Sequence, residues 1–146
     1  MIMKKLILLA ALFFLFNSCT DCDDDFVNVS NCNQTAQIIE EEPFNAIETY
    51  NYQISDIVLN QDCLEITIYS SGCNPDNWTM NLFSHNNFSA VFPTQRFAKI
   101  ELINNEACLA IFPKTISFDL TNYQIWGQSE VLITLEGWSE QIIYAY

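Results

Sequence analysis

The chain has 146 residues, of which 50% are hydrophobic and 16% are charged. This composition is typical of a packed globular domain, and the length predicts a single domain. Asp and Glu number 18 against 5 Lys and Arg, which gives a formal net charge of -13 at pH 7. We therefore expect no nucleic-acid partner, because a phosphate-binding surface needs clustered Lys and Arg.

The pattern of residues 1–18 is typical of a secretory signal peptide. Lys4 and Lys5 precede an apolar run over 6–16, which is shorter than the roughly 20 residues that a transmembrane helix needs. The end of this segment, Leu15-Phe16-Asn17-Ser18-Cys19, resembles the lipobox of bacterial lipoproteins. The resemblance implies cleavage before Cys19 and acylation of that residue, and several acyl chains together form a lasting membrane anchor.

An acidic cluster follows Cys19 after one intervening residue. It resembles the export tag that sends lipoproteins of the Bacteroidota to the outer face of the outer membrane, and its carboxylates are Asp21, Asp23, Asp24 and Asp25. A solvated acidic spacer is the alternative interpretation. The whole segment 19–43 is rich in polar residues, so we expect a flexible tether that leads to a folded domain over 44–146.

Beyond residue 43 the pattern changes to alternating apolar and polar residues. In Leu64–Tyr69 the apolar residues Leu64, Ile66 and Ile68 fall on one face, as in a half-buried strand. The same period predicts strands at 78–82, 98–102, 116–120 and 131–135. Further strand candidates are 50–59, 109–112 and 141–146. Gly137-Trp138-Ser139 predicts a hairpin that joins 131–135 to 141–146. Seven or eight short strands favour an all-β, antiparallel sandwich.

Six ordered segments together resemble a family of small uncharacterised lipoproteins of flavobacteria and relatives. They are Asp62-Cys63-Leu64-Glu65-Ile66, Ser71-Gly72-Cys73, Trp78-Thr79-Met80-Asn81-Leu82, Pro93-Thr94-Gln95-Arg96, Asn105-Glu106-Ala107-Cys108 and Ser117-Phe118-Asp119-Leu120. The resemblance runs from about Tyr50 to the C-terminus. It implies an immunoglobulin-like β-sandwich with no assigned activity, and it supplies no catalytic residue and no cofactor.

The cysteines predict disulfides, since an exported protein meets an oxidising compartment. Cys63 and Cys73 flank one predicted strand, and a strand of that length separates them too far for a bridge. Cys108 is then expected to pair with one of these two. The resemblance favours Cys73, because it places the turns at Cys73 and Cys108 close together. The pairing of the others stays open: Cys22, Cys32 and Cys63.

No metal site is expected. The pair with the spacing that zinc ligands prefer is Cys19 and Cys22, and acylation removes Cys19 from it. The acidic cluster contains no glycine of the kind that a calcium-binding loop needs at its centre.

Few residues point to catalysis. The single histidine, His85, lies beside Ser84, Asn86 and Asn87, which predicts an exposed loop. The carboxylates that could meet in space for glycoside hydrolysis are Asp56, Glu65, Glu101 and Asp119. Five aromatic residues could form a contact patch for a glycan or a protein, but core packing or cover of a strand face is the favoured interpretation for most of them: Tyr69, Phe83, Tyr123, Trp126 and Trp138.

We therefore expect a lipoprotein anchored in the outer membrane and exposed at the cell surface, with a binding or structural role and no catalysis. The acidic charge also fits an inhibitor or shield that binds cationic proteins. A carboxylate-based hydrolase is the remaining alternative.

Overall fold

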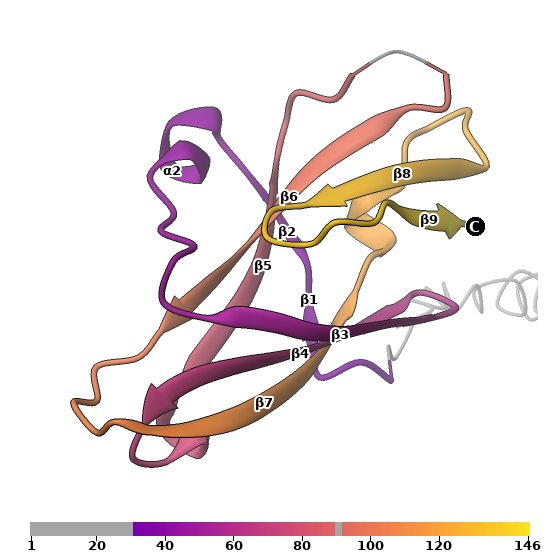
Figure 1. Cartoon of the computed structure of the whole chain (residues 1–146). Helices are drawn as coiled ribbons and strands as arrows, with labels where there is room; N and C mark the ends of the chain where they lie inside the picture. Colours follow the sequence, from indigo (N-terminus) through magenta and orange to yellow (C-terminus); the bar gives the residue numbers. More distant parts are fainter. Residues whose placement is uncertain (1–30, 90–91) are drawn as a thin grey trace, which may run out of the picture.

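The computed structural model describes residues 31–89 and 92–146 (Figure 1). The predicted leader, Cys19 and the acidic cluster lie outside these residues. The described part of the chain forms nine strands in two sheets, which confirms the all-β prediction. It contains no helix long and apolar enough to cross a membrane.

The first sheet has four strands and the second has five. In spatial order the four-stranded sheet consists of β1 (Gln34–Thr35), β7 (Ala110–Asp119), β4 (Cys63–Gly72) and β3 (Gln53–Asn60). The five-stranded sheet consists of β2 (Gln37–Ile39), β5 (Thr79–His85), β6 (Gln95–Ile103), β8 (Glu130–Leu135) and β9 (Ile142–Ala145). Three short helices join them: α2 (Glu41–Asn45), η1 (Pro75–Asn77) and η2 (Thr121–Tyr123).

Both sheets are mixed, so the expectation of purely antiparallel sheets is wrong. The parallel pairs are β1 with β7, β2 with β5, and β6 with β8. Between β6 and β8 the chain crosses to the other sheet, forms β7 there and returns through η2. This crossover brings β8 back in the same direction as β6.

The inward faces of the two sheets share one hydrophobic core. The predicted alternation in β4 is confirmed, because Leu64, Ile66 and Ile68 are fully buried. They pack in the same cluster as inward residues of the second sheet, which include Met80, Leu82, Ile100, Val131, Ile133 and Leu135. The predicted closing hairpin is also confirmed: Gly137 has a φ of +85°, and β9 pairs antiparallel with β8.

Strand β7 joins two segments that the sequence predicts as separate strands, with Pro113 in the middle. The Ser117 N–H points away from β4, because it donates to Asn33 Oδ1 at 3.0 Å. Backbone N–H groups alternate in direction along a strand, so position 113 also faces the open edge. Pro113 therefore removes no hydrogen bond to β4 and is tolerated there.

The expected tether over 19–43 is ordered where the structure describes it. Cys32 forms a disulfide with Cys63, with Cα atoms 5.6 Å apart. The chain then adds β1 to one sheet and β2 to the other, and Ala36, which lies between these strands, is 0% exposed. The predicted domain boundary at residue 43 is thus too late, because a polar segment can still pair through its backbone with an open strand edge.

Candidate binding groove

The short helix α2 covers part of the outer face of the five-stranded sheet (Figure 1). The side-chain amides of Asn86 and Asn87 hold it in place by donating to Glu40 Oε1 at 3.0 Å and to Glu41 Oε2 at 2.9 Å. This arrangement directs Phe44 down onto the sheet, where it is buried.

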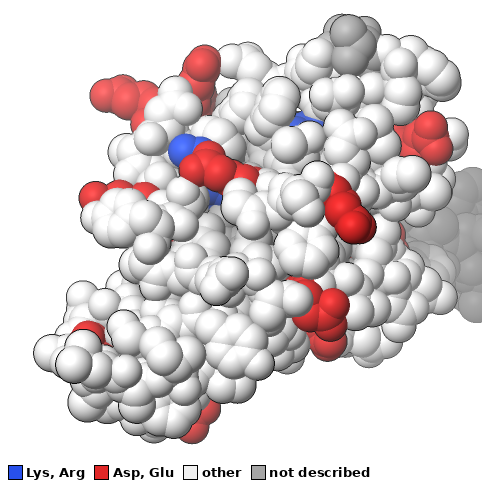
Figure 2. Space-filling model, in the orientation of Figure 1, with Lys and Arg blue, Asp and Glu red and all other residues white. Residues whose placement is uncertain are grey.

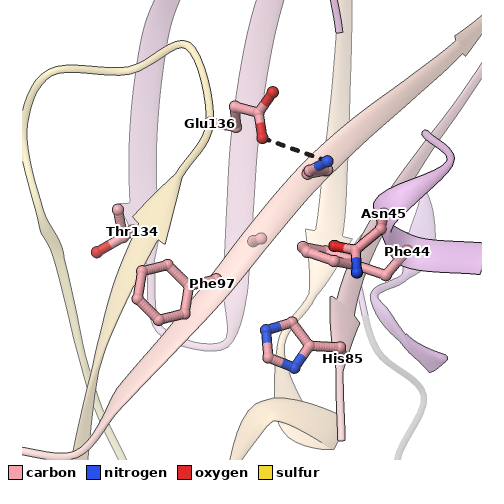
Figure 3. Close-up of a pocket in the computed structure, with 8 residues that line it drawn as sticks. Phe44, Asn45, His85, Phe97, Thr134 and Glu136 are labelled. Carbon is pink, nitrogen blue, oxygen red and sulfur yellow. Dashed lines mark ion pairs between the residues drawn. The ribbon is translucent and has the colours of Figure 1, made fainter. Parts of the chain in front are cut away.

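A groove of about 410 Å³ lies between α2 and the sheet (Figure 3). Its walls combine aromatic rings with a few polar groups, and the side chains come from α2, β5, β6, β8 and the turn after β8: Phe44, Asn45, His85, Phe97, Lys99, Thr134 and Glu136. A concave site with an apolar lining and few polar groups is the usual form of a small-molecule site.

Two of these rings form a flat platform. The ring centroids of His85 and Phe97 lie 6.2 Å apart, and the ring planes differ by 4°. The two planes are therefore parallel, and Figure 3 shows the two rings next to one another. The Phe44 ring meets His85 at 62°, with centroids 4.8 Å apart, and forms a wall at the end of the platform.

The polar groups at the rim of the groove include one ion pair. Lys99 Nζ lies 3.4 Å from Glu136 Oε2 and 5.1 Å from the centre of the Phe44 ring. Glu136 Oε1 also accepts a hydrogen bond from the Thr49 hydroxyl. Among the described residues, no hydrogen bond is made by the side chains of Asn45 and Thr134. The groove therefore pairs its own charges and keeps an amide and a hydroxyl for a ligand.

The prediction of an exposed loop around His85 is wrong. His85 is the last residue of β5, pairs with Ile39 of β2 and is half-buried. Its polar neighbours suggested a turn, but the parallel pairing with β2 extends the strand through Ser84 to His85, and the bend begins only at Asn86. The groove thus contains a residue that the sequence singled out, in an environment that the sequence did not predict.

The five candidate aromatic residues form no common patch, and core packing, the interpretation favoured for most of them, holds for Tyr123 and Trp138. Tyr123 is 0% exposed, Trp126 is 100% exposed, and Tyr69 lies on the other sheet. The structure instead uses Phe44 and Phe97, which sequence reasoning missed. A signal for Phe97 was present: it occupies an outward position of β6, where the alternation favours a polar side chain.

The four candidate carboxylates do not converge on one site. Asp56 and Glu65 lie on the four-stranded sheet, whereas Glu101 lies on the five-stranded sheet and accepts a hydrogen bond from Asn81 Nδ2 at 2.9 Å. Asp119 is buried and accepts a hydrogen bond from the Thr121 N–H at 2.8 Å. Two of the four thus have structural partners.

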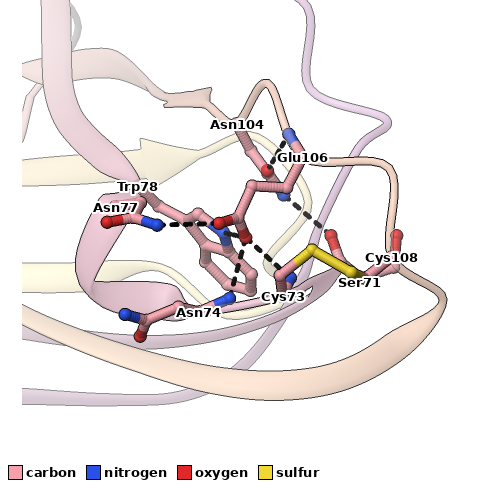
Figure 4. Close-up of a disulfide and its surroundings, with 8 residues drawn as sticks. All are labelled: Ser71, Cys73, Asn74, Asn77, Trp78, Asn104, Glu106 and Cys108. Carbon is pink, nitrogen blue, oxygen red and sulfur yellow. Dashed lines mark hydrogen bonds between the residues drawn. A yellow bond between two sulfur atoms is a disulfide. The ribbon is translucent and has the colours of Figure 1, made fainter.

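The second disulfide joins Cys73 and Cys108, the pair that the resemblance favoured (Figure 4). Beside it, Glu106 Oε2 accepts hydrogen bonds from the backbone N–H groups of Cys73 and Asn74 at 2.7 and 2.9 Å. The same oxygen accepts from Trp78 Nε1, and Oε1 accepts from Asn77 Nδ2, each at 2.9 Å.

These donors, the Asn74 N–H first among them, lower the pKa of Glu106 to about 2. We read this cluster as structural, because its donors already occupy the carboxylate. No group of three or more His, Cys, Asp or Glu within 31–89 and 92–146 could hold a metal ion.

The acidic side chains do not gather into one patch on the face shown in Figure 2. Figure 2 shows Asp and Glu side chains separated by neutral surface on the face in view, with few Lys or Arg among them. All three bases in the described residues have internal contacts. Lys99 pairs with Glu136, Lys114 Nζ donates to the Pro75 carbonyl, and buried Arg96 donates to the Tyr123 carbonyl.

Comparison with known proteins supports the fold. No protein-family model matches the chain, and no curated protein matches it in sequence. Among solved structures, it is similar to a protein of unknown function, DUF1344, from Bacteroides vulgatus ATCC 8482, with a TM-score of 0.53 and 17% sequence identity. The similarity covers 77% of this chain and 56% of that protein, so the chain spans little more than half its length.

Proposed function

We propose that the protein is a lipid-anchored, non-catalytic binding module of the outer membrane, and that the groove between α2 and the five-stranded sheet is its ligand site. The lipobox-like sequence before Cys19 supports the anchor. The acidic cluster behind it supports display at the cell surface. Two sheets around one core support an immunoglobulin-like sandwich as the carrier of the site.

The aromatic platform is the observation that carries this proposal. Phe97 is 43% exposed, although a phenyl ring on the outer face of a sheet gains more from being covered than from facing water. The adjoining polar groups give the site a means of orienting a ligand. An exposed aromatic ring beside polar groups supports binding. Lys99 and Glu136 pair with each other, which does not suggest a catalytic acid and base.

The groove can be tested with the purified full chain. Three uncharged probes are suitable: methyl β-D-glucopyranoside, N-acetyl-L-phenylalaninamide and D-sorbitol. We expect at least one of them to shift the NMR signals of Phe97 and Thr134, and Phe97→Leu to weaken that binding. The matched control is Trp126→Leu, because this fully exposed aromatic residue does not line the groove. If no probe shifts these signals, the groove is not the ligand site.

The anchor and its address require a separate test in cells. We expect Cys19→Ala to move the protein from the membrane fraction to the soluble fraction, because the acyl chains are lost. Neutralising the acidic cluster to Asn should protect the protein from protease added to intact cells. The changed residues are Asp21, Asp23, Asp24 and Asp25. Equal cleavage of this variant and the original would contradict the export-tag hypothesis.

A second candidate function is the binding of cationic proteins. All but four of the 18 acidic residues lie in the described part of the chain, against three of the five bases. Cytochrome c, a basic protein, is a suitable probe, and acetylated cytochrome c is its charge-depleted control. We expect binding of the basic form only, and a loss of binding at high salt as charges are screened. Binding that does not depend on salt would contradict this function.

A further inference from the structure

We infer that the groove binds the flat face of a neutral pyranose ring, stacked on the Phe97 and His85 platform. This inference rests on the proposed function, because it names the ligand class of the same site. It combines three properties of the groove: a flat aromatic floor, a self-neutralised ion pair and side chains that can both donate and accept hydrogen bonds.

The floor of the groove selects a flat apolar surface. The rings of His85 and Phe97 differ by only 4° in orientation, with centroids 6.2 Å apart, and the 43% exposed Phe97 ring offers a flat face to a ligand (Figure 3). A pyranose chair with equatorial hydroxyls has such a face, formed by its axial C–H groups. An open-chain polyol has the same hydroxyls but no such face.

The charges of the groove disfavour an ionic ligand. Lys99 already lies 3.4 Å from Glu136 and over the Phe44 ring. A cationic ligand would compete with Lys99 for both partners, whereas an anionic ligand would compete with Glu136 for Lys99. A neutral ligand leaves this ion pair in place and avoids the cost of separating it.

The rim favours a ligand with many hydroxyls. Asn45 offers both a donor and an acceptor, and the Thr134 hydroxyl can do either. Figure 3 shows these two side chains on opposite sides of the groove. Hydroxyls around a ring edge can satisfy such a mixed set, whereas a purely aromatic ligand would leave these groups without partners.

The size of the groove suits one ring or two. At about 410 Å³ it lies near the lower end of the range of roughly 300 to 1,000 Å³ that small-molecule sites occupy. We therefore expect recognition of a monosaccharide unit, free or within a longer glycan.

The test compares methyl β-D-glucopyranoside with D-sorbitol on the full chain, kept in lauryldimethylamine oxide because this detergent has no sugar head group. We expect the glucoside to bind at least tenfold more tightly than sorbitol. Phe97→Leu, which keeps an apolar side chain but removes the flat ring, should weaken glucoside binding by about tenfold. Phe97→Trp should retain it, and Trp126→Leu should leave it unchanged.

The outcomes separate this inference from the proposed function. Equal binding of glucoside and sorbitol would overturn the pyranose inference. So would binding of N-acetyl-L-phenylalaninamide alone at Phe97, although the proposed function would then stand. If none of the three probes binds in the groove, both the pyranose inference and the proposed function are overturned. Because Phe97 is 43% exposed, its substitution leaves the core intact, and an unchanged Tm for each variant verifies this.

Discussion

The disulfide Cys32–Cys63 is expected to contribute much of the folding stability, although it fixes a segment that looks like a tether in the sequence. Replacing both cysteines by Ser removes a cross-link between residues 31 positions apart. The chain-entropy estimate for a loop of this length is about 4 kcal/mol at 25 °C. This is a large part of the 5–15 kcal/mol that typically separates folded and unfolded states.

The second disulfide is a matched comparison. Cys73 and Cys108 are 35 positions apart, so the entropy estimate is again about 4 kcal/mol. Loss of this bridge also frees the loop that carries Glu106 and its hydrogen bonds. We therefore expect the Cys73→Ser, Cys108→Ser double variant to lose at least as much stability as the Cys32→Ser, Cys63→Ser variant.

Thermal unfolding of the oxidised proteins measures both effects. A loss of about 4 kcal/mol corresponds to a Tm lower by roughly 10 to 20 °C for a domain of this size. Each double variant keeps four of the six cysteines. We expect oxidation of these four to restore none of the lost stability. A Cys32→Ser, Cys63→Ser variant with an unchanged Tm would show that the N-terminal segment is not part of the cooperative domain, and would refute the packing described for β1 and β2.

Three further predictions concern stability. Glu106→Gln should destabilise the fold at pH 7 and reduce the loss of stability on acidification. Because the pKa of Glu106 in the folded state is lowered to about 2, the carboxylate stabilises the fold fully above its usual pKa, and this contribution disappears as the pH falls toward 2. Urea unfolding of both proteins at pH 7 and pH 3 measures the difference. Gly72→Ala should also lower the Tm, since its Cβ would lie 2.6 Å from Trp78 Cζ2 and 2.7 Å from Glu106 Oε2; an equal Tm would contradict this contact. Removing 142–146 should unfold the domain, because it deletes β9 and buried Tyr144, and circular dichroism would show it.

The regular strands could be predicted because their apolar residues alternate. Leu64, Ile66 and Ile68 are typical: the pleat places them on one face, and that face is buried. The turn at Gly137 was equally clear, since its positive φ suits glycine. Such features depend on neighbours in the sequence, so the sequence alone contains them.

The missed features depend on partners far along the chain. Ala36 is in the core because two sheets meet around it, although its neighbours are polar. His85 is in a strand because β2, some 46 residues earlier, pairs with it, as the Ile39 to His85 register shows. The groove also depends on segments distant in the sequence, since α2 carries Phe44 to the outer face where Phe97 lies. No local pattern predicts this meeting.

The most direct test of the groove as ligand site is to measure nuclear Overhauser effects between methyl β-D-glucopyranoside and the full chain. We predict contacts from the axial ring protons of the sugar to the ring protons of Phe97 and His85, and their loss in Phe97→Leu. Contacts to Trp126 or Tyr69 in place of these, or none at all, would contradict the central claim that the platform beneath α2 binds the ligand.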